Sequence, residues 1–231
     1  MAILAADTGG GDYQPVPQGT HDATCYKIVD AGTSINEYQG ERKKQHSVFI
    51  FWELPGCRTE DDRPMSIFHR YTLSLHERSA LRAHLQNWRN KPFTEKELKG
   101  FDITKILGVS CKISVGLTSG GREKVTGVFC ADGGAKKIPT ENEQVIFDVD
   151  EYCKEFSGES CEASKKACDI FDGLPNFLQW QIGGCDEPGK EPQPPCFEVQ
   201  AAKAKAERVA PAQAAKAEEV ADDEDLDDIP F

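Results

Sequence analysis

No stretch of the 231-residue sequence approaches the roughly 18 consecutive apolar residues that a membrane-spanning helix needs. The opening MAILAADTGG has no basic region and only a short apolar start, so we do not expect a secretory signal. Hydrophobic residues still make up 39% of the chain and aromatic residues 9%, which is enough for a packed core over part of its length. These features predict a soluble, cytoplasmic protein of one domain with appendages, or of two small domains.

Signatures of catalysis and of metal binding are also missing. His76 and His84 are eight residues apart, which is not the HExxH spacing of zinc peptidases. The nine cysteines are odd in number and form no CxxC pair, so we expect free thiols and neither a disulfide framework nor a zinc site. We therefore predict a protein that is no enzyme and that binds no cofactor or metal. A metal-dependent nuclease stays open, because carboxylates distant in sequence can meet in space.

The charge is strongly uneven along the chain. The formal net charge is -12, yet residues 27–137 hold 19 Lys and Arg against 13 Asp and Glu. Residues 138–231 hold 8 bases against 23 acids, so a modestly basic body precedes a strongly acidic C-terminal part. A basic body keeps nucleic acid open as a ligand, although the whole chain is acidic.

Composition divides the chain into five segments. We expect a flexible lead, a main domain, a Cys-rich acidic extension that packs on or beside it, a flexible linker rich in Ala, Lys and Glu, and an acidic tip. These segments are, in that order, residues 1–13, 14–137, 138–198, 199–221 and 222–231.

Within the main domain, hydrophobic periodicity predicts five strands and one principal helix. The capping box Ser74-Leu-His-Glu77 is expected to open the helix, which ends before Pro92, and Thr94-Glu-Lys-Glu97 is a second capping box. Asp30–Gln45 is polar and reads as a long loop. The expected strands are 20–29, 46–54, 64–73, 109–117 and 123–131.

Three strands, a helix and two further strands is the element order of the five-stranded OB barrel, in which the helix lies between strands three and four. We therefore predict a β-rich, α+β chain with an OB-like barrel, a C-terminal extension and a disordered acidic tail. Another α+β or β domain with five strands remains an alternative.

Large rings and basic groups in this arrangement are what unpaired bases and phosphates require. We select four rings for stacking: Phe49, Trp52, Phe68 and Tyr71. For phosphates we select basic residues of the strands and of the two loops that flank the groove of an OB barrel: Arg42, Lys43, Lys44, Arg70, Lys112, Arg122 and Lys124. The alternative for each ring is burial in the core, and for each charge simple solvation.

Residues 222–231, DDEDLDDIPF, join six acids to an apolar tripeptide. Such a segment can act as a portable ligand, because Phe231 can fill an apolar pocket while the acids steer it onto a basic rim. DDIPF resembles the C-terminal tip of bacterial single-stranded DNA-binding proteins, a docking peptide for replication, recombination and repair enzymes. That resemblance implies the partner-binding residues Asp227, Asp228, Ile229, Pro230 and Phe231; Leu226 stands where an aromatic residue is usual.

MAILAADTGG, VPQGTHDATCYKIV and IFDGLPNFLQWQI resemble a group of phage single-stranded DNA-binding proteins. This resemblance implies an OB-type core that coats single strands during DNA replication and recombination in the host bacterial cytoplasm. We therefore expect sequence-nonspecific binding of single-stranded DNA and recruitment of partner enzymes by the tip. The alternative is a decoy or adaptor that binds no DNA and occupies host enzymes through the same tip. Self-association is left open.

Overall fold

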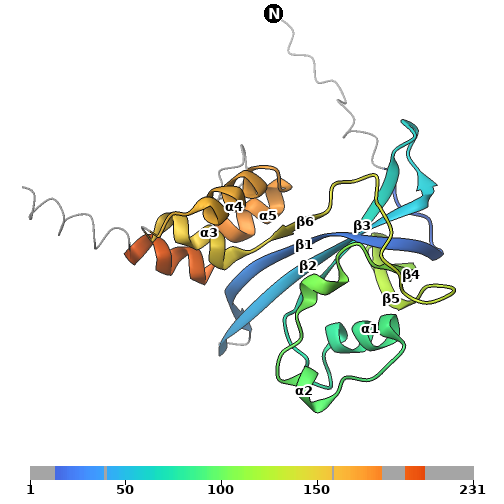
Figure 1. Ribbon diagram of the computed structural model, residues 1–231, viewed down its shortest axis with the longest axis horizontal. Coiled ribbons are helices and arrows are strands. Elements are labelled where there is room, and N and C mark those ends of the chain that lie inside the picture. Colours follow the sequence, from blue (N-terminus) through green and yellow to red (C-terminus); the bar gives the residue numbers. More distant parts are fainter. Residues whose placement is uncertain (1–13, 39–40, 158, 184–195, 206–231) are drawn as a thin grey trace, which may run out of the picture. The chain divides into compact units, whose positions relative to one another are not determined.

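The structure is a computed structural model that describes residues 14–38, 41–157, 159–183 and 196–205. It is an α+β fold with a six-stranded antiparallel sheet and several helices (Figure 1), so the predicted fold class is confirmed at that level. The strands are β1 (Gly19–Tyr38), β2 (Glu41–Arg58), β3 (Pro64–Thr72), β4 (Ser110–Leu117), β5 (Glu123–Cys130) and β6 (Val145–Phe147). The helices are α1 (Ala80–Arg89), α2 (Glu95–Leu98), the 3₁₀ helix η1 (Ile103–Ile106), α3 (Val149–Phe156), α4 (Glu162–Asp172) and α5 (Asn176–Gly183); residues 197–205 are also helical.

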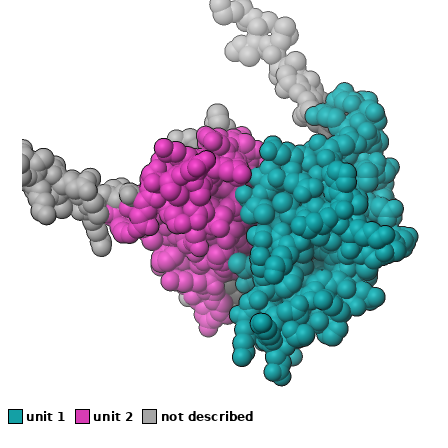
Figure 2. All heavy atoms as spheres, in the orientation of Figure 1, with its two compact units in different colours: residues 1–28, 49–146 teal, residues 29–48, 147–231 magenta. Residues whose placement is uncertain are grey.

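The chain forms two compact units (Figure 2). The first comprises residues 1–28 and 49–146, and the second residues 29–48 and 147–231. Strands β1 and β2 contribute residues to both units. The later boundary between the units lies after residue 146, whereas the sequence predicts a domain boundary after residue 137. The second unit also joins residues 29–48 of β1 and β2 to the C-terminal helices.

The sheet has the strand order β3-β2-β1-β4-β5, and β6 pairs with β1. Strand β4 is antiparallel to both β1 and β5. The core of the first unit is built on alternate residues of β2, where Ile50, Trp52 and Leu54 are fully buried or nearly so. The Trp52 ring centroid lies 6.2 Å from that of Trp88 on α1 and 6.5 Å from that of Tyr71 on β3. The apolar face of α1 closes this core, since Leu81 and Leu85 are also buried.

The two predicted capping boxes have opposite outcomes. Thr94 and Glu97 form the reciprocal box at the start of α2, as predicted. The box at Ser74 is wrong, because its hydroxyl accepts a hydrogen bond from His76 N, and α1 begins only at Ala80. Helix α1 ends before Pro92 as expected, at Asn90 in the left-handed conformation.

Residues expected to form a long loop are instead the ends of two strands, since β1 continues to Tyr38 and β2 begins at Glu41. Their polar groups find partners in C-terminal residues of the same unit. Thr33 N donates a hydrogen bond to Glu198, and a Cβ on Gly32 would meet Cys196 Sγ at 2.9 Å. His46 Nε2 lies 2.6 Å from Asp30 Oδ1, and this contact raises the pKa of His46. These partners are more than 100 positions away or on the facing strand, so the local pattern does not show them.

The second unit packs its helices around an aromatic cluster. Tyr152 on α3 stacks on Phe171 of α4 with ring centroids 4.5 Å apart, and both contact Phe147. Val199 is fully buried within the helical residues 197–205. The ordered chain therefore extends into the range 199–221 that the composition predicts to be linker; residues 206–221 of that range lie outside the described residues.

Cys161, at the start of α4, should react with alkylating agents at lower pH than Cys168 on the same helix. Cys161 is exposed, and its sulfur accepts a hydrogen bond from the backbone N–H of Ser164, which holds its pKa below the usual thiol value. Burial raises the pKa of Cys168. Iodoacetamide labelling read by mass spectrometry between about pH 6 and 8 measures both rates. Equal labelling of the two thiols at the lowest pH would contradict this assignment.

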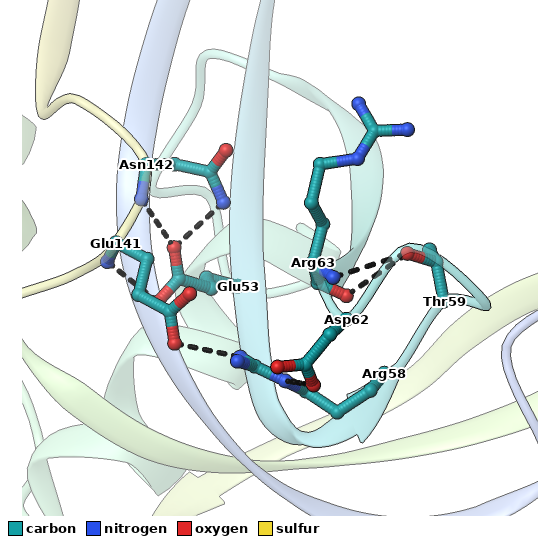
Figure 3. A network of polar contacts seen from close by, with 7 residues as sticks. All are labelled: Glu53, Arg58, Thr59, Asp62, Arg63, Glu141 and Asn142. Atoms are coloured by element: carbon teal, nitrogen blue, oxygen red, sulfur yellow. Dashed lines mark hydrogen bonds and ion pairs between the residues drawn. The ribbon is translucent and has the colours of Figure 1, made fainter.

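A buried carboxylate joins β2 to the segment between β5 and β6 (Figure 3). Glu53 accepts hydrogen bonds from Glu141 N at 3.0 Å, Asn142 N at 2.7 Å and Asn142 Nδ2 at 2.6 Å. Arg58 donates to Glu141 Oε1 at 2.6 Å and to Asp62 Oδ1 at 3.0 Å. The segment thus folds back onto β2 and the β2–β3 turn through charge-assisted hydrogen bonds.

Glu53→Ala should lower the free energy of unfolding by about 1.5–3 kcal/mol, because it leaves three donors without their charged acceptor. Glu53→Gln keeps one acceptor oxygen and should cost less. Glu60→Ala, at an exposed carboxylate in the β2–β3 turn, is the matched control and should change stability little. Urea unfolding measures all three. A Glu53→Ala protein as stable as the control would show that the network contributes nothing.

Candidate nucleic-acid interface

One face of β3 is a continuous exposed row of four residues, which we call the β3 row: Ser66, Phe68, Arg70 and Thr72. The alternate positions Ile67 and Tyr71 point into the core, as the two-residue period of a strand requires. The Phe68 side chain is 41% exposed. The row therefore presents an aromatic ring beside a guanidinium, the pair of groups that stacks on bases and contacts phosphates.

Phe68 stands on a cluster of buried rings. Its centroid lies 5.1 Å from that of Phe51 and 5.9 Å from that of Phe49, both on β2. Phe51 in turn contacts Tyr26 on β1 edge to face at 6.3 Å. These contacts hold one face of the Phe68 ring, so a base that stacked on its exposed part would meet a supported platform.

Cations lie over the same rings. Lys27 Nζ is 5.7 Å from the Phe51 centroid, and the Arg70 guanidinium carbon is 5.9 Å from the Phe49 centroid. Burial lowers the pKa of Lys27, because desolvation disfavours its charged form. Arg70 is exposed on the outer face of β3. Among the four residues of the β3 row, the cationic side chain is that of Arg70.

The β3 row leads to a cavity of about 390 Å³ at the N-terminal end of α1. Its lining includes Arg70, His76 and Arg78. The N-cap residue Ser79 makes no side-chain capping hydrogen bond, and the first turn of α1 carries no acidic residue. The first residues of α1 and two arginines line one cavity, which is a suitable environment for a phosphate group.

The opposite face of β3 carries no charge at neutral pH. The His69 and Tyr71 ring centroids are 4.4 Å apart, and the Tyr71 hydroxyl lies 2.7 Å from His84 Nδ1. Burial, together with the charges of the nearby His84 and Lys124, lowers the pKa of His69 to about 4. On β3, the positive charge that could contact DNA therefore lies on the outer face, at Arg70.

Three of the four predicted stacking residues are buried in the structure. The exposed fraction is 0% for Trp52, 2% for Tyr71 and 3% for Phe49. Trp52 and Tyr71 fill the core, and Phe49 lies beneath Phe68. Alternation separates the two faces of a strand, but it does not show that both faces of β2 are covered. Phe68 is the predicted ring that stays exposed.

The predicted phosphate-binding residues fall into separate groups. Arg70 belongs to the β3 row, and exposed Lys124 lies close enough to β3 to affect His69. Arg122, also exposed, follows the β4–β5 turn. Lys112 is ion-paired with Asp132 at 2.6 Å. This contact raises the pKa of Lys112 and balances its positive charge with a carboxylate.

Arg42, Lys43 and Lys44 lie on β2 in the second unit, where they are exposed. Lys43 pairs with Glu41 at 3.0 Å, and Lys44 Nζ lies 4.2 Å from the Phe197 ring centroid. They belong to a strand and not to the flanking loop that the sequence predicts.

Sequence reasoning missed two features of the first unit. Phe129 on β5 is 44% exposed and is paired in register with Lys112; the alternation of the strand could have indicated it. His76 and Arg78 line the cavity beside α1, and their position just before a helix is the signal that was available. The predicted partner-binding residues, Asp227, Asp228, Ile229, Pro230 and Phe231, lie outside the described residues.

Over the ranges that the structure describes, no three His, Cys, Asp or Glu residues gather as a metal site. In that same part of the chain, no helix has the length and apolar character needed to cross a bilayer. No protein-family model, curated protein or solved structure matches the chain.

Proposed function

We propose that this chain binds single-stranded DNA without strong sequence preference, through the β3 row and the cavity beside α1. The observation that carries the proposal is an exposed phenylalanine on a supported aromatic cluster, next to an arginine that also lines a cationic cavity. Stacking tolerates any base, because every base has a π-face, and phosphate contacts carry no sequence information. The role that follows is coating of single strands in phage DNA replication and recombination, with no catalytic step.

The arrangement of strands supports an OB-type barrel as the finer description of the first unit. The order β3-β2-β1-β4-β5 has β3 and β5 at its two ends, and these two strands contact each other. Helix α1 follows β3 in sequence and packs against both β3 and β5. In OB folds the face of strands 2 and 3 binds oligonucleotides, and the β3 row lies on that pair of strands.

The acidic segment 222–231 supports a second part of the proposal. Its six acids and Ile229-Pro230-Phe231 suit docking to a basic, apolar pocket on replication, recombination or repair enzymes. In this scheme the body holds the strand and the tip recruits the enzyme in the bacterial cytoplasm.

Fluorescence anisotropy tests DNA binding with a labelled single strand of about 30 nucleotides and the matching duplex, from about 50 to about 300 mM salt. We expect the full chain to prefer the single strand and to bind it more weakly as salt rises, because bound phosphates release counterions. Equal affinity for duplex, or no binding at the lowest salt, would contradict the proposal.

A further inference from the structure

A second cavity of the first unit, of about 440 Å³, lies among the C-terminal part of α1, α2 and η1. Its walls are largely apolar: Trp88 and Ile106 are buried, and Phe101 is half-buried. It shares no lining residue with the cavity at the N-terminal end of α1. The ten residues of α1 span about 15 Å, so the two cavities lie at opposite ends of one helix.

Arg89 gives this second cavity a buried donor that lacks an acceptor. Its guanidinium carbon lies 4.5 Å from the Phe93 ring centroid and 4.9 Å from that of Phe101, and Nη2 donates to Glu97 Oε1. Its Nη1 is buried and has no hydrogen-bond partner in the described part of the chain. A buried charged donor without a partner is costly, so it favours an anionic group from outside.

The rim of the cavity is cationic. Lys91, Lys96 and Lys105 are exposed. Among the described residues, Lys91 and Lys96 form no ion pair, whereas Lys105 lies near Asp102 and contributes to the lowered pKa of that carboxyl. The two acids in the lining already have donors. Glu97 binds Arg89 and Thr94, and Asp102 accepts from Thr104. The cavity therefore suits a ligand that joins an apolar side chain to several negative charges.

We infer that this cavity, which we call the α1–α2 pocket, binds residues 222–231 of a second copy of the chain. That segment places six acids before Ile229-Pro230-Phe231, so its apolar end matches the walls and its acids match the lysine rim. Sixteen residues, 206–221, separate it in sequence from the last described helix, a span of up to about 55 Å when fully extended.

The choice of a second copy as the source rests on the proposed function, because copies that coat one strand lie side by side and present each tip at high local concentration. The pocket and the β3 row have no residue in common, so one copy can hold DNA and a neighbour's tip at once. The inference thus gives the chain a means of cooperative coating, in addition to partner recruitment.

Sedimentation velocity of the full chain without DNA tests the inference, with two variants that disable opposite halves of the contact. Lys91→Glu with Lys96→Glu disrupts the rim of the α1–α2 pocket, and Phe231→Ala removes the apolar end of the tip. We expect the wild-type chain to self-associate and each variant to do so at least tenfold more weakly. An equimolar mixture of the two variants should associate again, since one supplies the pocket and the other the tip.

The matched control is Lys165→Glu with Lys166→Glu, the same change of charge at exposed positions on α4. It should associate as the wild type does. A synthetic peptide of residues 222–231 should dissociate the wild-type complex, and a peptide of the same composition in scrambled order should not.

A wild-type chain that stays monomeric at about 100 µM, a control as weak as the pocket variant, or a mixture that fails to associate would each overturn the inference. Since no DNA is present, these outcomes are independent of the proposed function. A chain that self-associates through the pocket but binds no single strand would contradict the proposed function alone.

Discussion

Phe68→Ala should weaken binding of a single strand of about 30 nucleotides by on the order of tenfold or more, because one stacked base contributes about 1–3 kcal/mol. The loss should be nearly independent of salt, since the ring neutralises no phosphate. Arg70→Ala should instead lower affinity and also reduce the dependence of affinity on salt. Fluorescence-anisotropy titrations at several salt concentrations separate the two effects.

Phe177→Ala is the matched control for Phe68→Ala. Phe177 lies on α5 in the second unit, and its side chain is 42% exposed, against 41% for Phe68. We expect its replacement to leave the affinity for single-stranded DNA unchanged. Equal losses for the two variants, or full affinity in Phe68→Ala, would remove the β3 row from the binding surface.

Trp52→Ala should lower the free energy of unfolding by about 3–5 kcal/mol, the usual cost of emptying a large aromatic site in a core. The Trp52 ring is fully buried against Tyr71 and Trp88, so its removal leaves a cavity that its neighbours can fill only in part. Urea or thermal unfolding measures the loss. Phe68→Ala should cost far less, because its ring is partly solvated.

The contrast between Trp52 and Phe68 separates a ring that stacks on DNA from a ring that only maintains the fold. A destabilised Trp52→Ala protein binds DNA in proportion to its folded fraction, whereas Phe68→Ala stays folded and binds weakly. A stable Trp52→Ala protein with lost DNA affinity would restore the assignment of Trp52 to stacking and contradict its burial.

The sequence predicts the centre of the fold well, because strong local signals agree there. The run of β-branched and aromatic residues in β2 predicts a strand. The spacing of Leu81, Leu85 and Trp88 predicts a helix, and the capping box at Thr94 predicts the start of another. Ser74 also fits a capping-box pattern, but its hydroxyl bonds within a turn. Short polar motifs of this kind are satisfied equally by a turn or a helix start, and only the surrounding chain decides between them.

The rest of the fold depends on contacts between residues far apart in the sequence, and local sequence patterns do not reveal such contacts. The residues around Gly32 read as loop until Cys196 and Glu198 are brought beside them. Both faces of β2 are covered from Val48 to Leu54, which alternation alone does not predict, so Phe49 and Trp52 are both buried. In the candidate interface, the alternation of β3 predicts that Phe68 and Arg70 lie on one face. The cavity beside α1 can be recognised only from the three-dimensional structure.

Photocrosslinking of a thymine-rich single strand to the full chain, with mass spectrometry of the tryptic peptides, tests the proposed interface most directly. The rings of Trp52 and Phe68 fall on different tryptic peptides. Trypsin cleaves after Lys44, Arg58 and Arg70, but not before Pro64. We predict adducts on peptide 59–70, which contains Phe68 and Arg70. Adducts confined to peptide 45–58, which contains Trp52, or to peptides of the second unit would contradict the account.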